Sequence, residues 1–305
     1  MKKYLPFLIL LLNISVLPLS AQNKNELLDG EMVKWIEQYM KYAVKFEHFS
    51  GVVLVAQNGS PVFEKAYGMA NYELDVPNTL DTKFRIGSVS KTFTAAAIML
   101  LQQQRKLNID NPIRTYLKNC PSHWNEITIR HLLNHTSGIV SYTGLTQATG
   151  NFLSIPHAQE EIIDLFKDQP LESKPGEKFN YNNSAYYLLG VIIEQVSGQT
   201  YEQFLKESFF VPLKMKNTGL DHNETILKGR ASGYRQANDS LLLNTFDISM
   251  DNLFSIGGLY STAPDLLLWD QAFYSGQLFS QSTLNEMFIV SENSHYGLGW
   301  VIDPI

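Results

Sequence analysis

A serine and a lysine stand three residues apart at the start of an apolar, alanine-rich segment, Phe84-Arg85-Ile86-Gly87-Ser88-Val89-Ser90-Lys91-Thr92-Phe93-Thr94-Ala95-Ala96-Ala97. If this segment is a helix, residues i and i+3 share a face, and the Lys91 amine can lie beside the Ser88 hydroxyl. A serine becomes a nucleophile when a neighbouring base takes its proton, and burial can lower a lysine pKa enough for that role. The pattern is short and common, so the alternative is a helix-capping serine beside a solvated lysine.

The N-terminal residues have the pattern of a secretory signal peptide. Two lysines precede an apolar run from Leu5 to Leu19, and small residues follow up to Ala21. The run is short for a transmembrane helix, and a small residue at its end favours cleavage. We therefore expect residues 1–21 to be removed. Residues 22–305 would then be exported, periplasmic or secreted, with no lasting membrane anchor.

Charge and metal-ligating residues narrow the classes of partner. The formal net charge is −6, and loss of the two signal-peptide lysines lowers it by two more, which disfavours nucleic acid and anionic membranes. Cys120 is the sole cysteine, so internal disulfides and thiolate-built metal sites are excluded. His131 and His135 are four apart, but Leu132 stands where a zinc-hydrolase motif has Glu. We expect structural histidines, no metal and no cofactor. The expected partner is a small-molecule or peptide substrate, and the oligomeric state stays open.

Hydrophobic periodicity predicts strands at both ends of the domain and helices between them. Strands are expected at 51–56, 62–68, 259–262 and 296–302, and helices at 31–46, 88–106, 129–134, 159–167, 184–196, 201–209 and 264–273. This order indicates an α/β lobe of about residues 31–90 and 255–305, with a mainly helical lobe of about 91–254 inserted.

A second group of polar residues lies on a loop before an apolar helix, in the stretch Pro175-Gly176-Glu177-Lys178-Phe179-Asn180-Tyr181-Asn182-Asn183-Ser184. Tyr181 and Asn183 are two residues apart and can point the same way on an extended loop. A phenol titrates near pH 10, but nearby lysines favour its anion, which could relay protons. Asn183 both donates and accepts hydrogen bonds, which suits it to hold Lys91 or a substrate amide. The alternative is a packed tyrosine and a helix-capping asparagine.

Together the two groups resemble the serine β-lactamase and penicillin-binding protein superfamily, and most of all its class C β-lactamase-related branch. That branch includes D-alanyl-D-alanine carboxypeptidases and related esterases and peptidases. Further segments resemble the family in family order, over roughly residues 50 to 300: Leu107-Asn108-Ile109-Asp110-Asn111-Pro112, residues 127–138, residues 210–218, residues 257–266 and Tyr296-Gly297-Leu298-Gly299-Trp300. The resemblance implies an α+β fold of the β-lactamase/transpeptidase type, an antiparallel sheet flanked by helices with an inserted, mainly helical lobe.

The resemblance also implies roles for four residues. Ser88 would be the acylated nucleophile, Lys91 its base partner and Tyr181 the second proton-transfer residue, whereas Asn183 would bind the substrate amide and orient Lys91. The Ser88 backbone N–H would be half of the oxyanion hole. Class A β-lactamases have Ser-Asp-Asn where this chain has Tyr181-Asn182-Asn183, so deacylation is expected to use the tyrosine. The implied function is a serine hydrolase that cleaves an amide, peptide, β-lactam or ester through an acyl-enzyme.

The family has a third box, Lys-Thr-Gly or His-x-Gly, which follows the segment that resembles Tyr296–Trp300. This chain ends at Ile305, before that point, and His295-Tyr296-Gly297 overlaps the preceding segment. We therefore expect a chain truncated at its C-terminus relative to the family, without the second oxyanion N–H and with an exposed sheet edge at residues 52–55. The alternative function is a catalytically impaired homologue that binds penicillin or cell-wall peptides.

Overall fold

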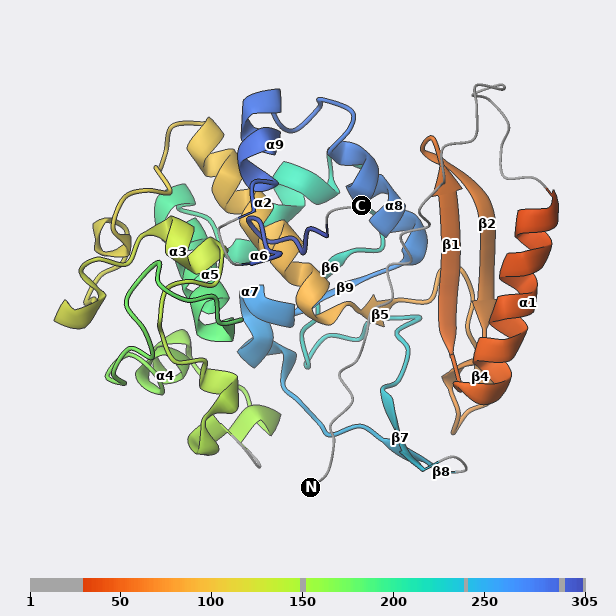
Figure 1. The fold of residues 1–305 in the computed structure, drawn as a ribbon. Helices are drawn as coiled ribbons and strands as arrows, with labels where there is room; N and C mark the ends of the chain where they lie inside the picture. The colour runs from red at the N-terminus through yellow and green to blue at the C-terminus, as the bar shows by residue number, and fades with distance from the viewer. Residues whose placement is uncertain (1–29, 149–151, 239–240, 291–293, 304–305) are drawn as a thin grey trace.

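The structure, a computed structural model, describes residues 30–148, 152–238, 241–290 and 294–303 (Figure 1). The predicted signal peptide, residues 1–21, lies outside the described residues. Figure 1 shows a β-hairpin and one covering helix on one side of the molecule and a larger, mainly helical body on the other. Within the described residues, no helix has the length and apolar character needed to span a membrane.

The hairpin consists of β1 (Gly51–Gln57) and β2 (Ser60–Tyr67), and α1 (Gly30–Phe46) packs against it. Asn58 and Gly59 form the turn, both with positive φ, as a tight hairpin turn requires. The apolar side of α1 meets the hairpin in a small hydrophobic cluster of its own, formed by Ile36, Met40, Ala43 and Phe63.

The helix α2 (Ser90–Gln103) runs through the centre of the main core and is entered through the 3₁₀ turn η1 (Gly87–Val89). Every residue from Ser90 to Met99 is buried, as expected for a helix that is apolar on all sides. Small alanine side chains let α5 (Asn183–Ser197) and α7 (Phe254–Gly257) pack closely against it.

Shorter helices and turns surround α2. They are η2 (Ile113–Thr115), η3 (Ser122–Trp124), α3 (Ile129–Leu133), η4 (Tyr142–Gly144), η5 (Thr146–Ala148), η6 (Phe152–Ser154), α4 (Gln159–Asp164), α6 (Tyr201–Leu205), the π-helical turn η7 (Lys206–Phe210), η8 (Met250–Leu253), α8 (Ala263–Ala272) and α9 (Gln281–Met287). Side-chain caps fix several starts, because the hydroxyls of Thr128, Thr262 and Ser280 accept backbone N–H groups of α3, α8 and α9.

The remaining strands pair antiparallel in small sheets. They are β3 (Met69–Asn71) with β4 (Val76–Pro77), β7 (Tyr234–Asn238) with β8 (Leu241–Asn244), and β5 (Phe84–Arg85) with β9 (Leu259–Ser261) and β6 (Gly219–Leu220) in the order β5-β9-β6. Phe84 pairs with Ser261, and Tyr260 pairs with Gly219. Since β5 ends just before η1 and β9 begins just after α7, this small sheet fixes the start of α2 beside α7.

A buried carboxylate ties the same sheet together. Asp221 follows β6 and is 1% exposed. Its oxygens accept from Nε of Arg85 at 2.7 Å and from a guanidinium nitrogen of Arg230 at 2.6 Å. The segment that leads into Ser88 is therefore anchored from β6.

Most of the predicted helices and strands are present, but the short strands β3 to β8 were not predicted, and three of the predicted elements differ clearly. The helix predicted at 159–167 ends at Asp164, and the helix predicted at 201–209 becomes π-helical after Leu205. The strand predicted at 296–302 is wrong, because the chain bends back on itself there. Gly299 has φ 91°, and the N–H of Gly297 donates to the carbonyl of Trp300 at 2.9 Å. The boundaries of the two lobes stay a prediction.

Candidate active site

Ser88 lies in η1, between β5 and α2, and so precedes the first turn of α2. Gly87, with φ 51°, makes the turn that presents it. The Nζ atom of Lys91 donates to Oγ of Ser88 at 3.2 Å. The structure therefore brings together the serine and lysine that their spacing predicted to be neighbours.

Lys91 is 1% exposed, and burial lowers its pKa from 10.5 to about 7. Nζ also donates to the carbonyl oxygen of Ile256 at 2.8 Å. The rings of Tyr181 and Tyr186 lie 5.0 and 5.7 Å from Nζ, close enough for cation–π attraction to the charged form. Near neutral pH a large share of Lys91 is therefore a neutral amine, held beside Ser88.

Tyr181 donates a hydrogen bond from its phenolic oxygen to Oγ of Ser88 at 2.8 Å. Although 42% of the residue is exposed, burial around its hydroxyl raises its pKa, and the hydrogen bond with Ser88 opposes this effect. The expectation that nearby lysines favour the phenolate is therefore wrong. Tyr181 is a neutral phenol at neutral pH and has a proton to donate.

Asn183 begins α5 beside the turn η4. Its Nδ2 atom donates to Oγ1 of Thr143 at 2.8 Å, and its backbone N–H donates to Oγ of Ser141 at 3.1 Å. The residue that caps α5 is Asn182, whose Oδ1 accepts the N–H of Ala185 at 2.9 Å. Asn183 is thus held by η4, whereas Lys91 bonds to Ser88 and Ile256. The roles of Asn183 in binding an amide and orienting Lys91 stay predictions.

The carbonyl of Ile256, which accepts the hydrogen bond from Lys91, belongs to α7. The sequence analysis did not connect this helix with the site. The next carbonyl toward the N-terminus, that of Ser255, accepts from Oγ1 of Thr94 on α2 at 2.7 Å. Phe254 begins α7 with φ 31° and ψ −117°, a conformation that favours glycine. Gly190 of α5 makes room for α7, because a Cβ there would lie 2.3 Å from Oγ of Ser255 and 2.4 Å from the Phe254 ring.

The two histidines occupy different places. Nδ1 of His131 accepts the N–H of Thr128 at 3.2 Å and so helps to cap α3. His135 is buried beneath Tyr181, and its Nδ1 accepts the N–H of Asn182 at 3.0 Å. Both have structural contacts, as predicted, but the place of His135 next to the catalytic candidates was missed.

The family model described as Beta-lactamase matches residues 33–305. The chain belongs to the beta-lactamase family. It is 32% identical over 276 residues to the putative penicillin-binding protein PbpX of Bacillus subtilis, covering 90% of this chain and 68% of that protein. It spans 60% of a second penicillin-binding protein of B. subtilis, at 30% identity.

Solved structures confirm the predicted fold. A penicillin-binding protein from Bacillus halodurans matches with a TM-score of 0.73 and 28% identity, covering 85% of this chain and 82% of that one. A D-stereospecific amidohydrolase from Streptomyces matches with a TM-score of 0.73 and 25% identity, covering 86% and 82%. The chain therefore has the α+β fold of the β-lactamase and penicillin-binding protein superfamily, and it is a member of a family of serine hydrolases and penicillin-binding proteins.

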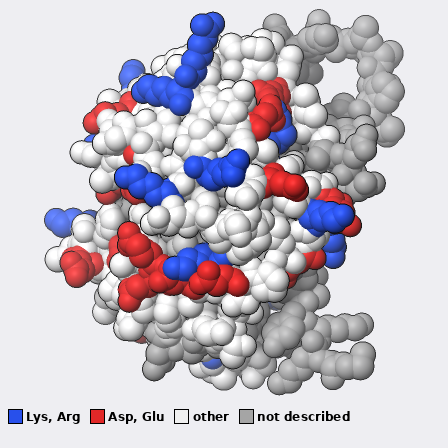
Figure 2. Space-filling view, turned by 90° about the vertical axis from the view of Figure 1, so that its left-hand side faces the viewer, with Lys and Arg blue, Asp and Glu red and all other residues white. Residues whose placement is uncertain are grey.

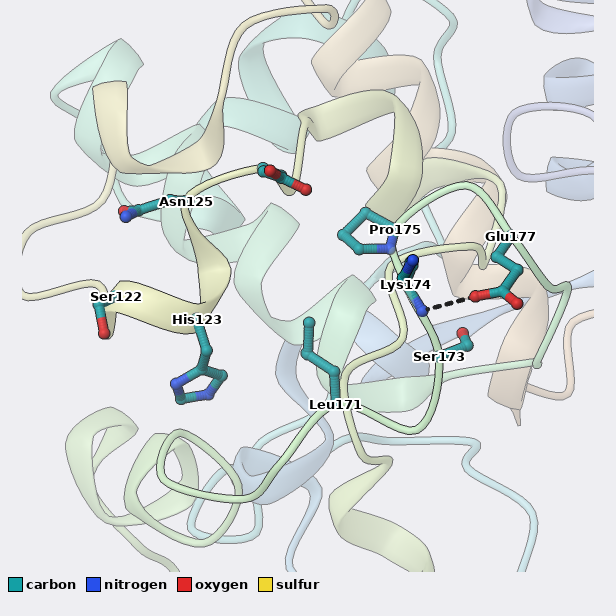
Figure 3. Close-up of a pocket in the computed structure, with 9 residues that line it drawn as sticks. Ser122, His123, Asn125, Leu171, Ser173, Lys174, Pro175 and Glu177 are labelled. Carbon is teal, nitrogen blue, oxygen red and sulfur yellow. Dashed lines mark hydrogen bonds between the residues drawn. The ribbon is translucent and has the colours of Figure 1, made fainter.

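A surface pocket of about 640 Å³ lies apart from the four predicted site residues (Figure 3). One side is formed by Ser173, Lys174, Pro175 and Glu177, and the other by Ser122, His123, Asn125 and Glu126. The loop on the first side continues along the chain to Tyr181.

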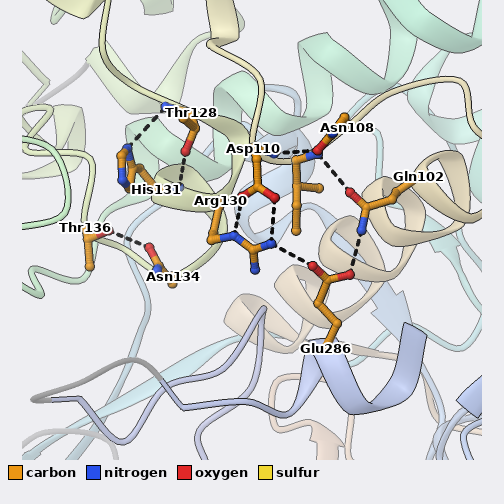
Figure 4. A network of polar contacts seen from close by, with 10 residues as sticks. Gln102, Asn108, Asp110, Thr128, Arg130, His131, Asn134, Thr136 and Glu286 are labelled. Carbon is orange, nitrogen blue, oxygen red and sulfur yellow. Dashed lines mark hydrogen bonds and ion pairs between the residues drawn. The ribbon is translucent and has the colours of Figure 1, made fainter. Parts of the chain in front are cut away.

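An ion-pair network joins α3 and α9 to the last turn of α2 (Figure 4). Arg130 binds Asp110 at 2.6 Å and Glu286 at 2.7 Å, and Glu286 also accepts from Gln102 of α2 at 2.7 Å. The strong hydrogen bond with Asp110 raises the pKa of Arg130, which stays charged. This network braces the C-terminal end of α2, whose other end lies at the candidate active site.

The molecular face in Figure 2 carries basic and acidic side chains interspersed on a mostly uncharged surface. This face has no extended basic patch of the kind that binds nucleic acid. The absence of nucleic-acid partners stays a prediction for the protein as a whole.

Proposed function

We propose that this protein is an exported serine hydrolase that cleaves an amide, peptide, β-lactam or ester through an acyl-enzyme on Ser88. One observation carries the proposal: Lys91 and Tyr181 both direct hydrogen bonds to Oγ of Ser88, at 3.2 and 2.8 Å. A nucleophile within hydrogen-bond distance of a base and of a proton donor is the arrangement that acyl transfer needs.

The pKa shifts of Lys91 and Tyr181 indicate which of the two residues accepts a proton and which donates one. Lys91, with a pKa near 7, accepts the proton of Ser88 while Oγ attacks the substrate carbonyl. Tyr181, whose pKa is raised, keeps its proton until it gives it to the leaving nitrogen or oxygen. Acylation thus ends with a lysine ammonium, a phenolate, a serine ester and a released amine or alcohol.

Deacylation reverses these transfers. The Tyr181 phenolate takes a proton from the attacking water, and the Lys91 ammonium returns its proton to the departing Ser88 oxygen. We expect the backbone N–H of Ser88 to stabilise negative charge on the substrate oxygen in both steps. The cycle releases the product acid and restores free Ser88, neutral Lys91 and neutral Tyr181. The enzyme therefore gains or loses no net proton over one cycle.

The comparisons support an acyl donor of the kind named in related proteins. One similar structure is called a D-stereospecific amidohydrolase, and several relatives are called penicillin-binding proteins. We therefore propose D-amino-acid amides or peptides, and β-lactams, as the first substrates to test, with simple esters next. The signal-peptide pattern of residues 1–21 supports export.

The deciding experiment is intact-mass analysis of residues 22–305 after incubation with a penicillin and, separately, with a fluorophosphonate. We expect one covalent adduct with each reagent, and no adduct with Ser88→Ala. An adduct with penicillin that decays indicates β-lactamase turnover, and a lasting adduct indicates a penicillin-binding peptidase. A folded wild-type protein that forms neither adduct would contradict the proposal.

A second candidate is a protein that binds penicillin or cell-wall peptides without turnover. The names of the relatives, which describe binding, favour it. If Ser88→Ala keeps the full affinity for a cell-wall peptide and wild-type protein releases no product, this candidate replaces the hydrolase.

A further inference from the structure

His135 contacts the chain on both sides of Tyr181. Its carbonyl oxygen accepts the N–H of Asn180 at 2.8 Å, and its Nδ1 accepts the N–H of Asn182 at 3.0 Å. The imidazole lies against the tyrosine itself, with ring centroids 4.5 Å apart. One residue thus holds three consecutive positions of the loop that carries the phenol.

The imidazole is in turn fixed by its surroundings. His135 is 1% exposed, and three further rings lie within 6 Å of it, those of Tyr296 at 4.7 Å, Tyr186 at 4.8 Å and Phe179 at 5.9 Å. Because Nδ1 accepts a backbone N–H, the proton of the neutral ring must be on Nε2. Burial, helped by the nearby charge of Lys91, lowers the pKa of His135 well below its usual value and keeps the ring neutral.

Packing alone does not explain a histidine here. Nε2 is buried and has no hydrogen-bond partner in the described part of the chain, and such an orphaned group is destabilising. A phenylalanine or leucine would fill the same space without an unpaired nitrogen, but either would be strained at the φ of 60° found here. The nitrogen that compensates for the unpaired Nε2 is Nδ1, and its partner is the amide directly after Tyr181.

We propose that His135 is a positioning residue that sets the place of the Tyr181 hydroxyl against Ser88. This inference rests on the proposed function, since it assigns His135 a part in proton transfer that acts through Tyr181. Displacement of a reacting group by about 1 Å can slow catalysis by about 100-fold, so the two loop hydrogen bonds and the ring contact control the reaction.

Two substitutions at His135 test separately the hydrogen bond accepted by Nδ1 and the packing of the aromatic ring. His135→Asn keeps a hydrogen-bond acceptor, because the asparagine side-chain oxygen is two bonds from Cβ, as Nδ1 of histidine is. Asparagine also tolerates the φ of 60° found at this position. His135→Phe keeps an aromatic ring and removes the acceptor. We expect the penicillin acylation rate to fall by about 100-fold in His135→Phe and to stay within about tenfold of wild type in His135→Asn. Equal rates in wild type and His135→Phe would overturn the proposal.

A double-mutant cycle tests whether His135 acts through Tyr181. In a Tyr181→Phe background the phenol is gone, so adding His135→Phe should lower the acylation rate no further. If both substitutions lower the rate by their full separate factors, the two residues act independently and His135 is not a positioning residue.

Amide hydrogen exchange provides a readout that does not depend on activity. In His135→Phe we expect faster exchange in a peptide over residues 179–183 and unchanged exchange in a peptide over α2. Unchanged exchange in both, or an equal rise in both, would overturn the positioning role. If wild-type protein is not acylated at all, the proposed function fails, and the exchange result still decides whether His135 holds the Tyr181 loop.

Discussion

The phenolic oxygen of Tyr181 lies 2.8 Å from Oγ of Ser88, although 93 positions separate the two residues. Two helices make this contact, because α2 begins just after Ser88 and α5 begins just after Tyr181, and they pack against each other in the main core. The geometry of the proposed catalytic site is therefore a consequence of how two buried helices meet.

Removal of the phenol should affect chemistry more than folding. We expect Tyr181→Phe to slow acylation by a β-lactam by about 10²- to 10⁴-fold, the usual contribution of general acid–base catalysis. Because 42% of the residue is exposed and its ring is kept, the urea midpoint should change little. Stopped-flow acylation and urea unfolding measure the two effects. An unchanged rate would remove Tyr181 from the mechanism.

The pH dependence of acylation should report Lys91. Burial lowers its pKa to about 7, and only the neutral amine can accept the proton of Ser88. The acylation rate should therefore rise with pH through about 7 and level off above it. In Lys91→Met the rise should vanish together with most of the rate. A wild-type profile that is flat between pH 5.5 and 8.5 would argue against Lys91 as the base.

The same pKa shift predicts a stability effect. The Lys91 pKa is about 7 when folded against an ordinary value of 10.5, so between these values the unfolded chain binds more protons and stability rises with pH. Below pH 7 the buried charge opposes folding in full, by about 5 kcal/mol for this shift. Lys91→Met should be more stable than wild type at pH 6, and this advantage should shrink toward pH 10.5. Urea unfolding of both proteins from pH 6 to 10 checks it, and a constant difference would contradict it.

Gly190 should not accept a side chain. A Cβ there would lie 2.3 Å from Oγ of Ser255, so Gly190→Ala must push α7 away from α5. We expect a loss of about 1–3 kcal/mol in the free energy of unfolding. Acylation should also be slower, because the carbonyl of Ile256 on α7 accepts a hydrogen bond from Lys91. Gly144→Ala is the control, since a Cβ there meets nothing within 4 Å. Equal effects of the two substitutions would refute the close approach.

Asp221 should matter far more than an exposed acid. Asp221→Asn leaves Arg85 and Arg230 without their buried carboxylate, which should destabilise the protein by about 2–4 kcal/mol, because both arginines are about one-third exposed. Asp164 pairs with Lys167 at the surface, and Asp164→Asn should change stability by about 0–1 kcal/mol. Thermal unfolding of both variants makes the comparison. Similar melting temperatures would indicate that the Asp221 pairs are weak.

The sequence predicted best what is local along the chain. Ser88 and Lys91 could be placed together because three residues on a helix fix their distance. Tyr181 needed the family resemblance, and its raised pKa depends on burial that no motif reveals. His135 was predicted to be structural, but its place beside Tyr181 and that of Ile256 beside Lys91 could not be predicted, because these contacts join segments 46 and 165 positions apart. The wrong strand at 296–302 had alternating apolar residues, but its glycines allow a tight bend that the alternation does not predict.

The hydrophobic cluster beneath α1 is separate from the main core, although β1 also contacts α8. Ile36, Met40, Ala43 and Phe63 pack together apart from the main core, which holds the helices on which Ser88 and Tyr181 depend. Elements with their own small core can open sub-globally, at a lower free energy than global unfolding. We therefore expect the α1–hairpin unit to open at a lower free energy than the main core, with loss of the β1–α8 contacts, while Ser88, Lys91 and Tyr181 stay together.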